Sequence, residues 1–238
     1  MRFLLPASVW LVSVLPAAAQ DFSLALGDGG SLSTRSIQLI VLITLLSLVP
    51  ALAVMVTCFP FIVTVLSILR QAIGLPQAPP NMLIVSLALF LTWYVMDPVF
   101  TEAWARGIGP LTRNEVDLQT AFSAGMAPFR TFMAGRLDGD TFAALQALRP
   151  GENSAPLDSP LSLLVPSFLL SEIQRAFEIG FLIYLPFLVI DLVVAAVLMS
   201  MGMMMVPPAV VSMPFKLAFF VVADGWSLVS GALVRSYF

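Results

Sequence analysis

The fold is decided by residues 177–208, which read FEIGFLIYLPFLVIDLVVAAVLMSMGMMMVPP. Within residues 179–206, Asp191 is the only charged residue. At about 1.5 Å per residue this run exceeds the hydrocarbon core of a bilayer, about 30 Å, so it predicts a membrane-spanning helix. The double proline at positions 207 and 208 predicts the turn that follows.

Three more apolar segments surround this stretch. Two of them, residues 37–69 and 71–96, contain no charged residue and are separated by Arg70. The third, residues 209–234, contains only two charged residues, Lys216 and Asp224. The whole chain is 59% hydrophobic and 11% charged, whereas soluble domains are about 25% charged. We therefore predict an all-α integral membrane protein of two helical hairpins, with four spans kinked by prolines such as Pro50 and Pro60.

The N-terminus has the pattern of a secretory signal peptide. A short basic start precedes an apolar core at residues 3–14 and an A-x-A motif at residues 17–19. This pattern predicts cleavage between Ala19 and Gln20, and the alternative is an uncleaved anchor. Cleavage would place residues 20–36 outside the cytoplasm as an extracytoplasmic segment.

A polar insert separates the two apolar halves, residues 37–100 and 161–238. Residues 101–158 hold 12 of the 25 charged residues and contain no long apolar run. We expect short helices here, the first broken at Pro128 and the second starting after a cap at Asp138 or Asp140. Residues 149–160 are rich in proline, serine and asparagine and predict a linker. With a cleaved signal, the insert (101–160) lies outside the cytoplasm.

The composition excludes most catalytic chemistry. The chain has no histidine, and its one cysteine, Cys58, lies in an apolar run, where a buried inert thiol is expected. Asp191 and Asp224 lack the G-x-G-D context of intramembrane aspartyl proteases, and there is no phosphate-binding glycine loop. A net charge of −3 with a single lysine argues against nucleic-acid binding. We expect no enzymatic activity, no metal and no other cofactor.

Charges inside the apolar segments need partners, because an unpaired charge in the bilayer costs a few kcal/mol. Asp191 and Lys216 form the obvious pair. If the turn is centred on Pro207, however, their depths differ by seven residues, or about 10 Å of helix rise. We therefore expect at least one of them to find its partner on another subunit. The alternative is that Lys216 snorkels to the interface while Asp191 is protonated or hydrated.

Just before this span, three charges recur at helical spacing. These charges are Glu172, Arg175 and Glu178. They form either a solvated rim or a charge network between subunits, and their spacing fits both alternatives.

Five of the twelve methionines fall within residues 199–205, next to Gly202 and the two prolines, Pro207 and Pro208. Methionine is flexible and apolar, so a cluster of it can deform around varied shapes and still exclude water. On a turn, this cluster suits a compliant seal around a pore. The alternative is ordinary packing at a helix end.

Residues 177–208, followed by SMPFKLAFFVVADGW at 212–226, resemble the family of the flagellar biosynthetic protein FliP, which is also represented in virulence type III secretion systems. PSFLLSEIQRAFEIGF at 166–181 and APPNMLIVSLALFLTWYVMDPV at 78–99 fit the same family. The insert matches it more loosely through Ala121, Gly125, Pro128, Arg130, Phe132 and Met133. The signal peptide and the sizeable insert favour the flagellar branch.

The resemblance implies a pore-forming subunit of a flagellar protein export gate in the bacterial inner membrane, at the basal body, with the insert in the periplasm. Such subunits form homo-oligomers with FliQ-like and FliR-like proteins, and unfolded rod, hook and filament subunits pass through. The family's methionine gasket falls on Met203, Met204 and Met205. Its intersubunit polar contacts fall on Asp191, Lys216 and Glu172, with Arg175 and Glu178 on the same helix.

Three other functions stay open at this point. The first is the homologous subunit of a virulence type III secretion system. The second is a small-solute or ion transporter that uses Asp191 as a proton relay. The third is a scaffold for a gate that other subunits line.

Overall fold

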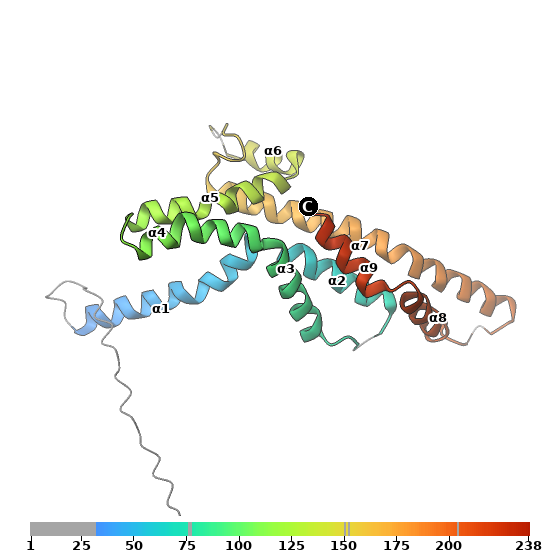
Figure 1. Ribbon diagram of the computed structural model, residues 1–238. Coiled ribbons are helices and arrows are strands. Elements are labelled where there is room, and N and C mark those ends of the chain that lie inside the picture. Colours follow the sequence, from blue (N-terminus) through green and yellow to red (C-terminus); the bar gives the residue numbers. More distant parts are fainter. Residues whose placement is uncertain (1–31, 76–77, 150, 152, 204) are drawn as a thin grey trace, which may run out of the picture. The chain divides into compact units, whose positions relative to one another are not determined.

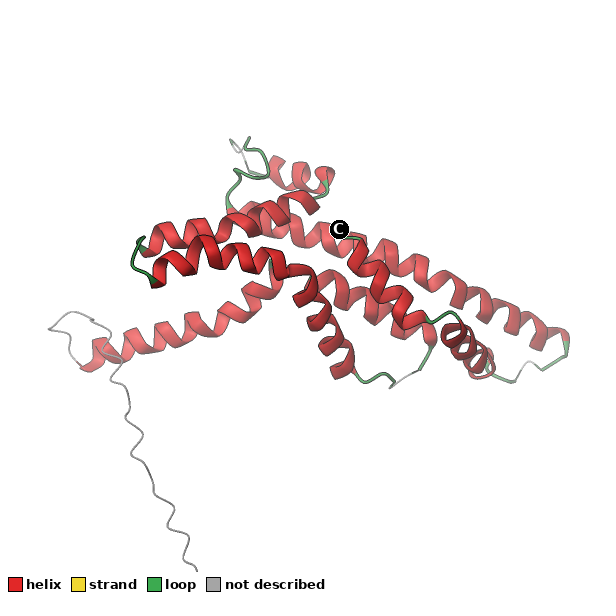
Figure 2. Cartoon of the chain, viewed as in Figure 1, coloured by secondary structure: helices red, strands yellow, loops and turns green. Residues whose placement is uncertain are grey.

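The structure is a computed structural model that describes residues 32–75, 78–149, 151, 153–203 and 205–238. Within these residues every regular element is helical (Figures 1 and 2). The elements are α1 (Leu32–Met55), α2 (Phe59–Ile73), α3 (Asn81–Ala103), a π-helical turn η1 (Trp104–Ile108), α4 (Gly109–Thr112), α5 (Leu118–Arg136), α6 (Gly139–Ala147), α7 (Leu161–Ser200), α8 (Pro208–Val222) and α9 (Gly225–Arg235).

In the described part of the chain, three helical segments are long and apolar enough to cross a membrane: Ser36–Met55, Asn81–Thr112 and Leu161–Ser200. The bent pair α8 and α9 makes a fourth if it counts as one span. The all-α membrane fold that the sequence predicts is therefore confirmed. The chain divides into two units, residues 1–46 and 47–238, and the second contains α2 to α9.

The first apolar segment forms two helices. Helix α1 ends at Met55, and α2 begins at Phe59 with Pro60 in its first turn, where a proline costs no hydrogen bond. Helix α2 is only about 22 Å long, too short to span a bilayer. Its side chains form the centre of the core, packed against α3, α7 and α8. Six of them are fully buried: Phe61, Ile62, Val65, Leu66, Leu69 and Ala72. The segment 37–100 thus supplies three helices where the sequence predicts a pair.

The insert also differs from its prediction. Helix α3 runs on through η1 and α4 to Thr112, so the first part of the insert continues a span. The break expected at Pro128 is wrong, because α5 continues through this residue, which is buried where α5 packs on its neighbours α3, η1 and α7. The cap at Asp138 is confirmed, since its carboxylate accepts the Thr141 amide (2.8 Å) and starts α6.

Helix α5 crosses the π-helical turn in unusually close contact. A Cβ atom added to Gly107 would lie 2.8 Å from both the Ala121 carbonyl oxygen and the Gly125 Cα. Both of these are backbone atoms, which cannot rotate away as a side chain can. Only glycine therefore lets the two helices approach at this crossing.

We expect Gly107→Ala to lower the free energy of unfolding by about 1–3 kcal/mol, because the extra methyl group forces the backbones of η1 and α5 apart. Denaturant titration of the chain in detergent measures the effect. Gly135→Ala, in α5, is the matched control. Nothing lies within 4 Å of its added Cβ, so it should be neutral or slightly stabilising. Equal losses for both variants would contradict the close crossing.

The second half begins with one long helix. Helix α7 has 40 residues and is about 60 Å long, roughly twice the thickness of the hydrocarbon core. The last apolar segment, which the sequence predicts as one span, is instead divided. Helices α8 and α9 meet at an angle of 61°, and Asp224 between them has φ +48°.

Candidate functional site

The methionine-rich segment is a loop, residues 201–207, that joins α7 to α8; we call it the methionine loop. Gly202 has φ +75°, a conformation that glycine adopts without strain. Its amide bonds to the Met199 carbonyl (3.0 Å), and the Met203 amide bonds to the Leu198 carbonyl (3.0 Å). This pair of bonds is a Schellman motif, which satisfies the last carbonyls of α7 and turns the chain. Pro207 and Pro208 then start α8.

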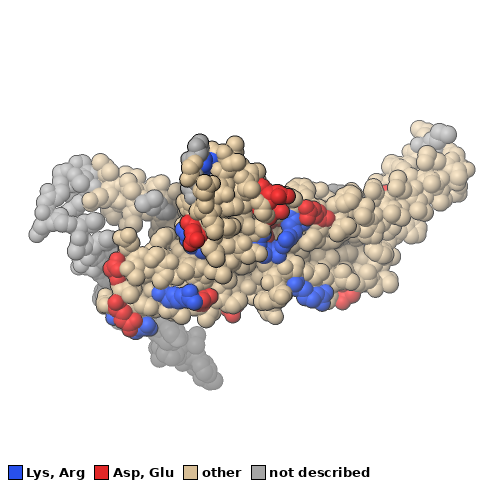
Figure 3. Space-filling model, turned by 90° about the horizontal axis from the view of Figure 1, so that it is seen from above, with Lys and Arg blue, Asp and Glu red and all other residues tan. Residues whose placement is uncertain are grey.

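The methionine side chains of this loop lie mostly on the surface. Met205 is 98% exposed, Met201 66% and Met203 41%, while Met204 lies outside the described residues. The surrounding end of α7 and α8 shows almost no charge, whereas Lys, Arg, Asp and Glu lie over the other parts of this face (Figure 3). An exposed apolar loop of this kind is suited to contact with another chain or a substrate.

An apolar groove of about 570 Å³ adjoins the loop. It runs between α7 and α8, and its lining is aliphatic, aromatic or methionine throughout: Val189, Ile190, Val193, Val194, Val197, Leu198, Met201, Met203, Val211 and Phe215. Met201 and Met203 therefore belong both to the loop and to the groove, so that the loop and the hairpin below it form one continuous apolar surface.

Asp191 and Lys216 pair within this hairpin, which corrects the prediction that their depths keep them apart. The Lys216 Nζ donates to Asp191 Oδ2 (2.6 Å), and Ser212 Oγ donates to Asp191 Oδ1 (2.5 Å). The turn is not centred on Pro207, because α7 ends at Ser200 and α8 begins at Pro208. Asp191 therefore lies nine residues before the end of one helix and Lys216 eight residues after the start of the next. The two side chains are level, and neither needs a second subunit as its partner.

The Lys216 ammonium group also lies at the C-terminal end of α2. Gly74 caps that helix with φ +83°, and a Cβ atom placed on Gly74 would be 3.7 Å from Nζ. The carbonyl end of a helix carries a partial negative charge, so it stabilises a nearby cation. Lys216 therefore joins α2, α7 and α8, and its side chain is only 7% exposed.

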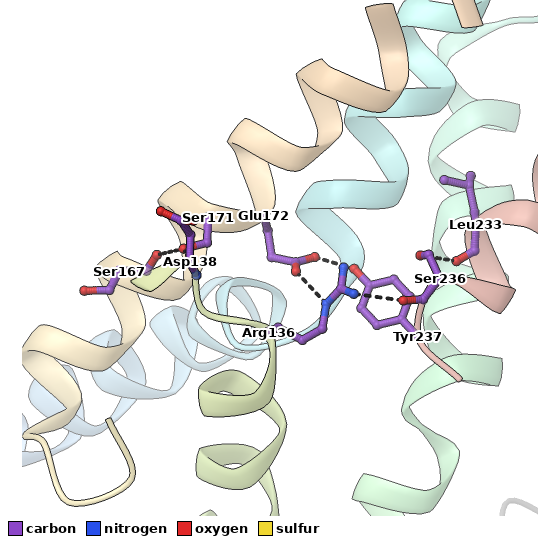
Figure 4. Close-up of polar contacts among 8 residues, drawn as sticks. All are labelled: Arg136, Asp138, Ser167, Ser171, Glu172, Leu233, Ser236 and Tyr237. Atoms are coloured by element: carbon purple, nitrogen blue, oxygen red, sulfur yellow. Dashed lines mark hydrogen bonds and ion pairs between the residues drawn. The ribbon is translucent and has the colours of Figure 1, made fainter. Parts of the chain in front are cut away.

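A second buried ion pair was not predicted. Arg136 Nε, on α5, donates to Glu172 Oε1 (3.0 Å), as Figure 4 shows. The Glu172 side chain is fully buried. The hydroxyl of Tyr237 donates to the other oxygen of Glu172. Arg136 and Tyr237 are 101 residues apart in sequence, so no local pattern connects them.

This burial separates Glu172 from the other two charges of its group. The prediction of a solvated rim is wrong for Glu172, because this side chain is buried and both of its oxygens are occupied within the chain. Its contact with another subunit stays a prediction. Arg175 and Glu178 are exposed, and Glu178 accepts a hydrogen bond from Gln174 (3.2 Å). A role for these two between subunits stays a prediction. The predicted cleavage between Ala19 and Gln20 lies outside the described residues.

Comparison with known proteins identifies the family. Residues 42–233 match the FliP family. This match covers about four fifths of the chain. The chain belongs to the FliP family. The resemblance that the sequence shows is thereby confirmed.

Relatives of this FliP-family chain carry the name flagellar biosynthetic protein FliP. The protein of that name from Caulobacter vibrioides is 50% identical over 94% of this chain and 86% of its own length. The one from Agrobacterium fabrum is 46% identical over 100% of this chain and 99% of its own length. The one from Pectobacterium carotovorum is 42% identical over 100% of this chain and 90% of its own length.

Proposed function

We propose that this chain is a pore-forming subunit of a flagellar type III protein export gate, through which unfolded rod, hook and filament subunits cross the inner membrane. The methionine loop, with Met203, Met204 and Met205, closes the channel. Several copies assemble with FliQ-like and FliR-like membrane proteins at the flagellar basal body. The insert, residues 101–160, faces the periplasm.

One observation carries this proposal beyond family membership: the methionine loop is exposed on a hairpin that is itself well fixed. The Schellman motif and the two prolines fix the ends of the loop, and the Asp191–Lys216 pair holds α7 and α8 in register. The side chains of Met201, Met203 and Met205 are exposed, and methionine side chains are intrinsically flexible. A seal must close the pore when no substrate is present and must deform around a substrate that passes through. Flexible apolar side chains on a rigid support meet both requirements.

Gating in this proposal is passive. The sequence contains no nucleotide-binding motif, so the energy comes from the proton-motive force and from a separate ATPase. The pairing of Asp191 with Lys216 and Ser212 weighs against the rival transporter, in which Asp191 relays protons, because both carboxylate oxygens are engaged. Uptake of a solute by the purified chain, abolished by Asp191→Asn, would favour that rival instead. Relatives named as flagellar proteins favour the flagellar system over the virulence system.

Photo-crosslinking tests whether the loop lines the channel or only supports it. We expect a photoreactive amino acid at position 205 to crosslink a stalled export substrate in intact cells. Position 82 on α3 is the matched control, since Met82 is also a highly exposed methionine (82%) but lies away from the loop. Substrate adducts at position 82 and none at position 205, in assembled complexes, would make the chain a scaffold.

A further inference from the structure

The C-terminal turn ends in the buried ion pair described above. Helix α9 ends at Arg235, and the Ser236 and Tyr237 amides continue its turn by bonding to the Ala232 and Val234 carbonyls. The Arg136 Nη1 donates to the Ser236 carbonyl (2.9 Å), and Tyr237 donates to Glu172 (Figure 4). Two consecutive residues of the C-terminal turn thus bind both members of the ion pair.

The ring of Tyr237 also makes contacts, in addition to the hydrogen bond of its hydroxyl. It stacks on Phe132 of α5 at 6.0 Å and meets the edge of Phe61 of α2 at 5.6 Å, between ring centroids. The Arg136 guanidinium carbon lies 4.0 Å from the centre of the ring, a distance typical of a cation–π contact. Burial, together with the neighbouring Glu172 carboxylate, raises the pKa of Tyr237, so the phenol stays protonated and donates.

The other end of α9 has the features of a hinge. Asp224 has φ +48°, makes no side-chain cap, and is exposed between two helices that meet at 61°. Gly225 sits against the Phe220 ring so closely that an added Cβ would lie 2.1 Å from a ring atom. The bend therefore combines a left-handed residue, a conformation that aspartate adopts more readily than most residues, with a close contact that only glycine permits.

The bend divides the last apolar segment into two short helices. Helices α8 and α9 are about 22 and 16 Å long, so neither crosses a bilayer of about 30 Å alone. Buried Val229 and Leu233 contribute apolar packing, but the polar contacts that reach α5 and α7 come from residues 236 and 237.

We propose that Ser236 and Tyr237 form a C-terminal latch, which fastens α9 to α5 and α7 through Arg136 and Glu172 and keeps it folded about the hinge at Asp224. Releasing the latch frees α9 to swing on α8. The latch joins three segments of the second unit, namely the insert, the long helix α7 and the C-terminal turn. It is independent of the proposed export function, since it rests only on contacts within one chain.

Double electron–electron resonance on the full chain in lipid nanodiscs tests the latch. Spin labels go on cysteines introduced at exposed Thr131 of α5 and exposed Ala232 of α9, while native Cys58 is buried and inert. In the labelled chain without further substitutions, we expect a single narrow distribution of distances between the two labels. Tyr237→Ala should add a longer and broader population, displaced by up to the length of α9, about 16 Å.

Two milder variants keep the test decisive if Tyr237→Ala does not fold. Tyr237→Phe keeps the ring and loses the hydroxyl, and Glu172→Gln keeps the shape and loses the charge. Each should produce a smaller fraction of the longer distance. Phe238→Ala is the control, because Phe238 is 78% exposed and should leave the distance unchanged. Unaltered distributions in all folded Tyr237 and Glu172 variants would overturn the latch.

Discussion

Lys216→Met is expected to destabilise the single chain by about 2–4 kcal/mol, because it leaves the Asp191 carboxylate without its cation among apolar helices. The Lys216 side chain is 7% exposed and that of Asp191 30%, so solvent compensates only part of the loss. The ammonium group also leaves the carbonyl end of α2. Denaturant titration in detergent measures the stability of the monomer, and native gels measure the yield of complex.

The double variant Asp191→Leu with Lys216→Met separates charge from packing. Replacing both partners of a buried ion pair by apolar residues is often neutral, so we expect most of the stability to return. Glu115→Gln is the control for ion pairs in general, since the Arg113–Glu115 pair is exposed to solvent and its loss should leave the stability almost unchanged. If Lys216→Met weakened only the complex and left the monomer unchanged, the pair would act between subunits after all.

Replacing Met203, Met204 and Met205 together with alanine is expected to leave assembly intact and to make the membrane leak ions and small solutes, several-fold or more above the wild type. Alanine keeps the backbone of the loop, because the Schellman motif depends on Gly202 and not on these side chains. It removes the long flexible groups that would fill the pore. Conductance across planar bilayers that contain the purified complex measures the leak.

The same three positions changed to leucine provide the matched control. Leucine keeps the apolar volume, so the pore should stay closed, although with less freedom to deform around a substrate. Met82→Ala, which removes an exposed methionine on α3, should have no effect on conductance. Tight closure with all three loop methionines replaced by alanine would remove the seal from the proposed function.

The sequence predicts well the features that depend on neighbouring residues. The membrane class, the helical content, the cap at Asp138 and the loop after α7 all follow from composition, periodicity or the known preferences of aspartate, glycine and proline. Asp191 and Lys216 were also recognised as a pair by their charge and burial. A turn centred on Pro207 predicts the wrong geometry for this pair, because α7 ends at Ser200 and α8 begins at Pro208. The centre of the turn therefore lies about three residues earlier, and this shift changes the count along both helices.

The features that the sequence does not predict depend on tertiary packing. Hydropathy cannot separate α1 from α2, because both are apolar, although α1 is exposed and α2 forms the core. Helix α5 passes through Pro128 because neighbouring helices hold it, which outweighs the local cost of proline. Arg136, Glu172 and Tyr237 meet across three distant segments, so only the folded chain brings them together.

Deletion of the gene in its own bacterium tests the proposed function most directly, with swimming motility and the secretion of hook and filament proteins as readouts. We expect the deletion to abolish both. The intact gene should restore them, and a copy encoding Lys216→Met should restore them poorly or not at all. Normal motility together with normal secretion in the deletion strain would contradict the assignment to the flagellar export gate.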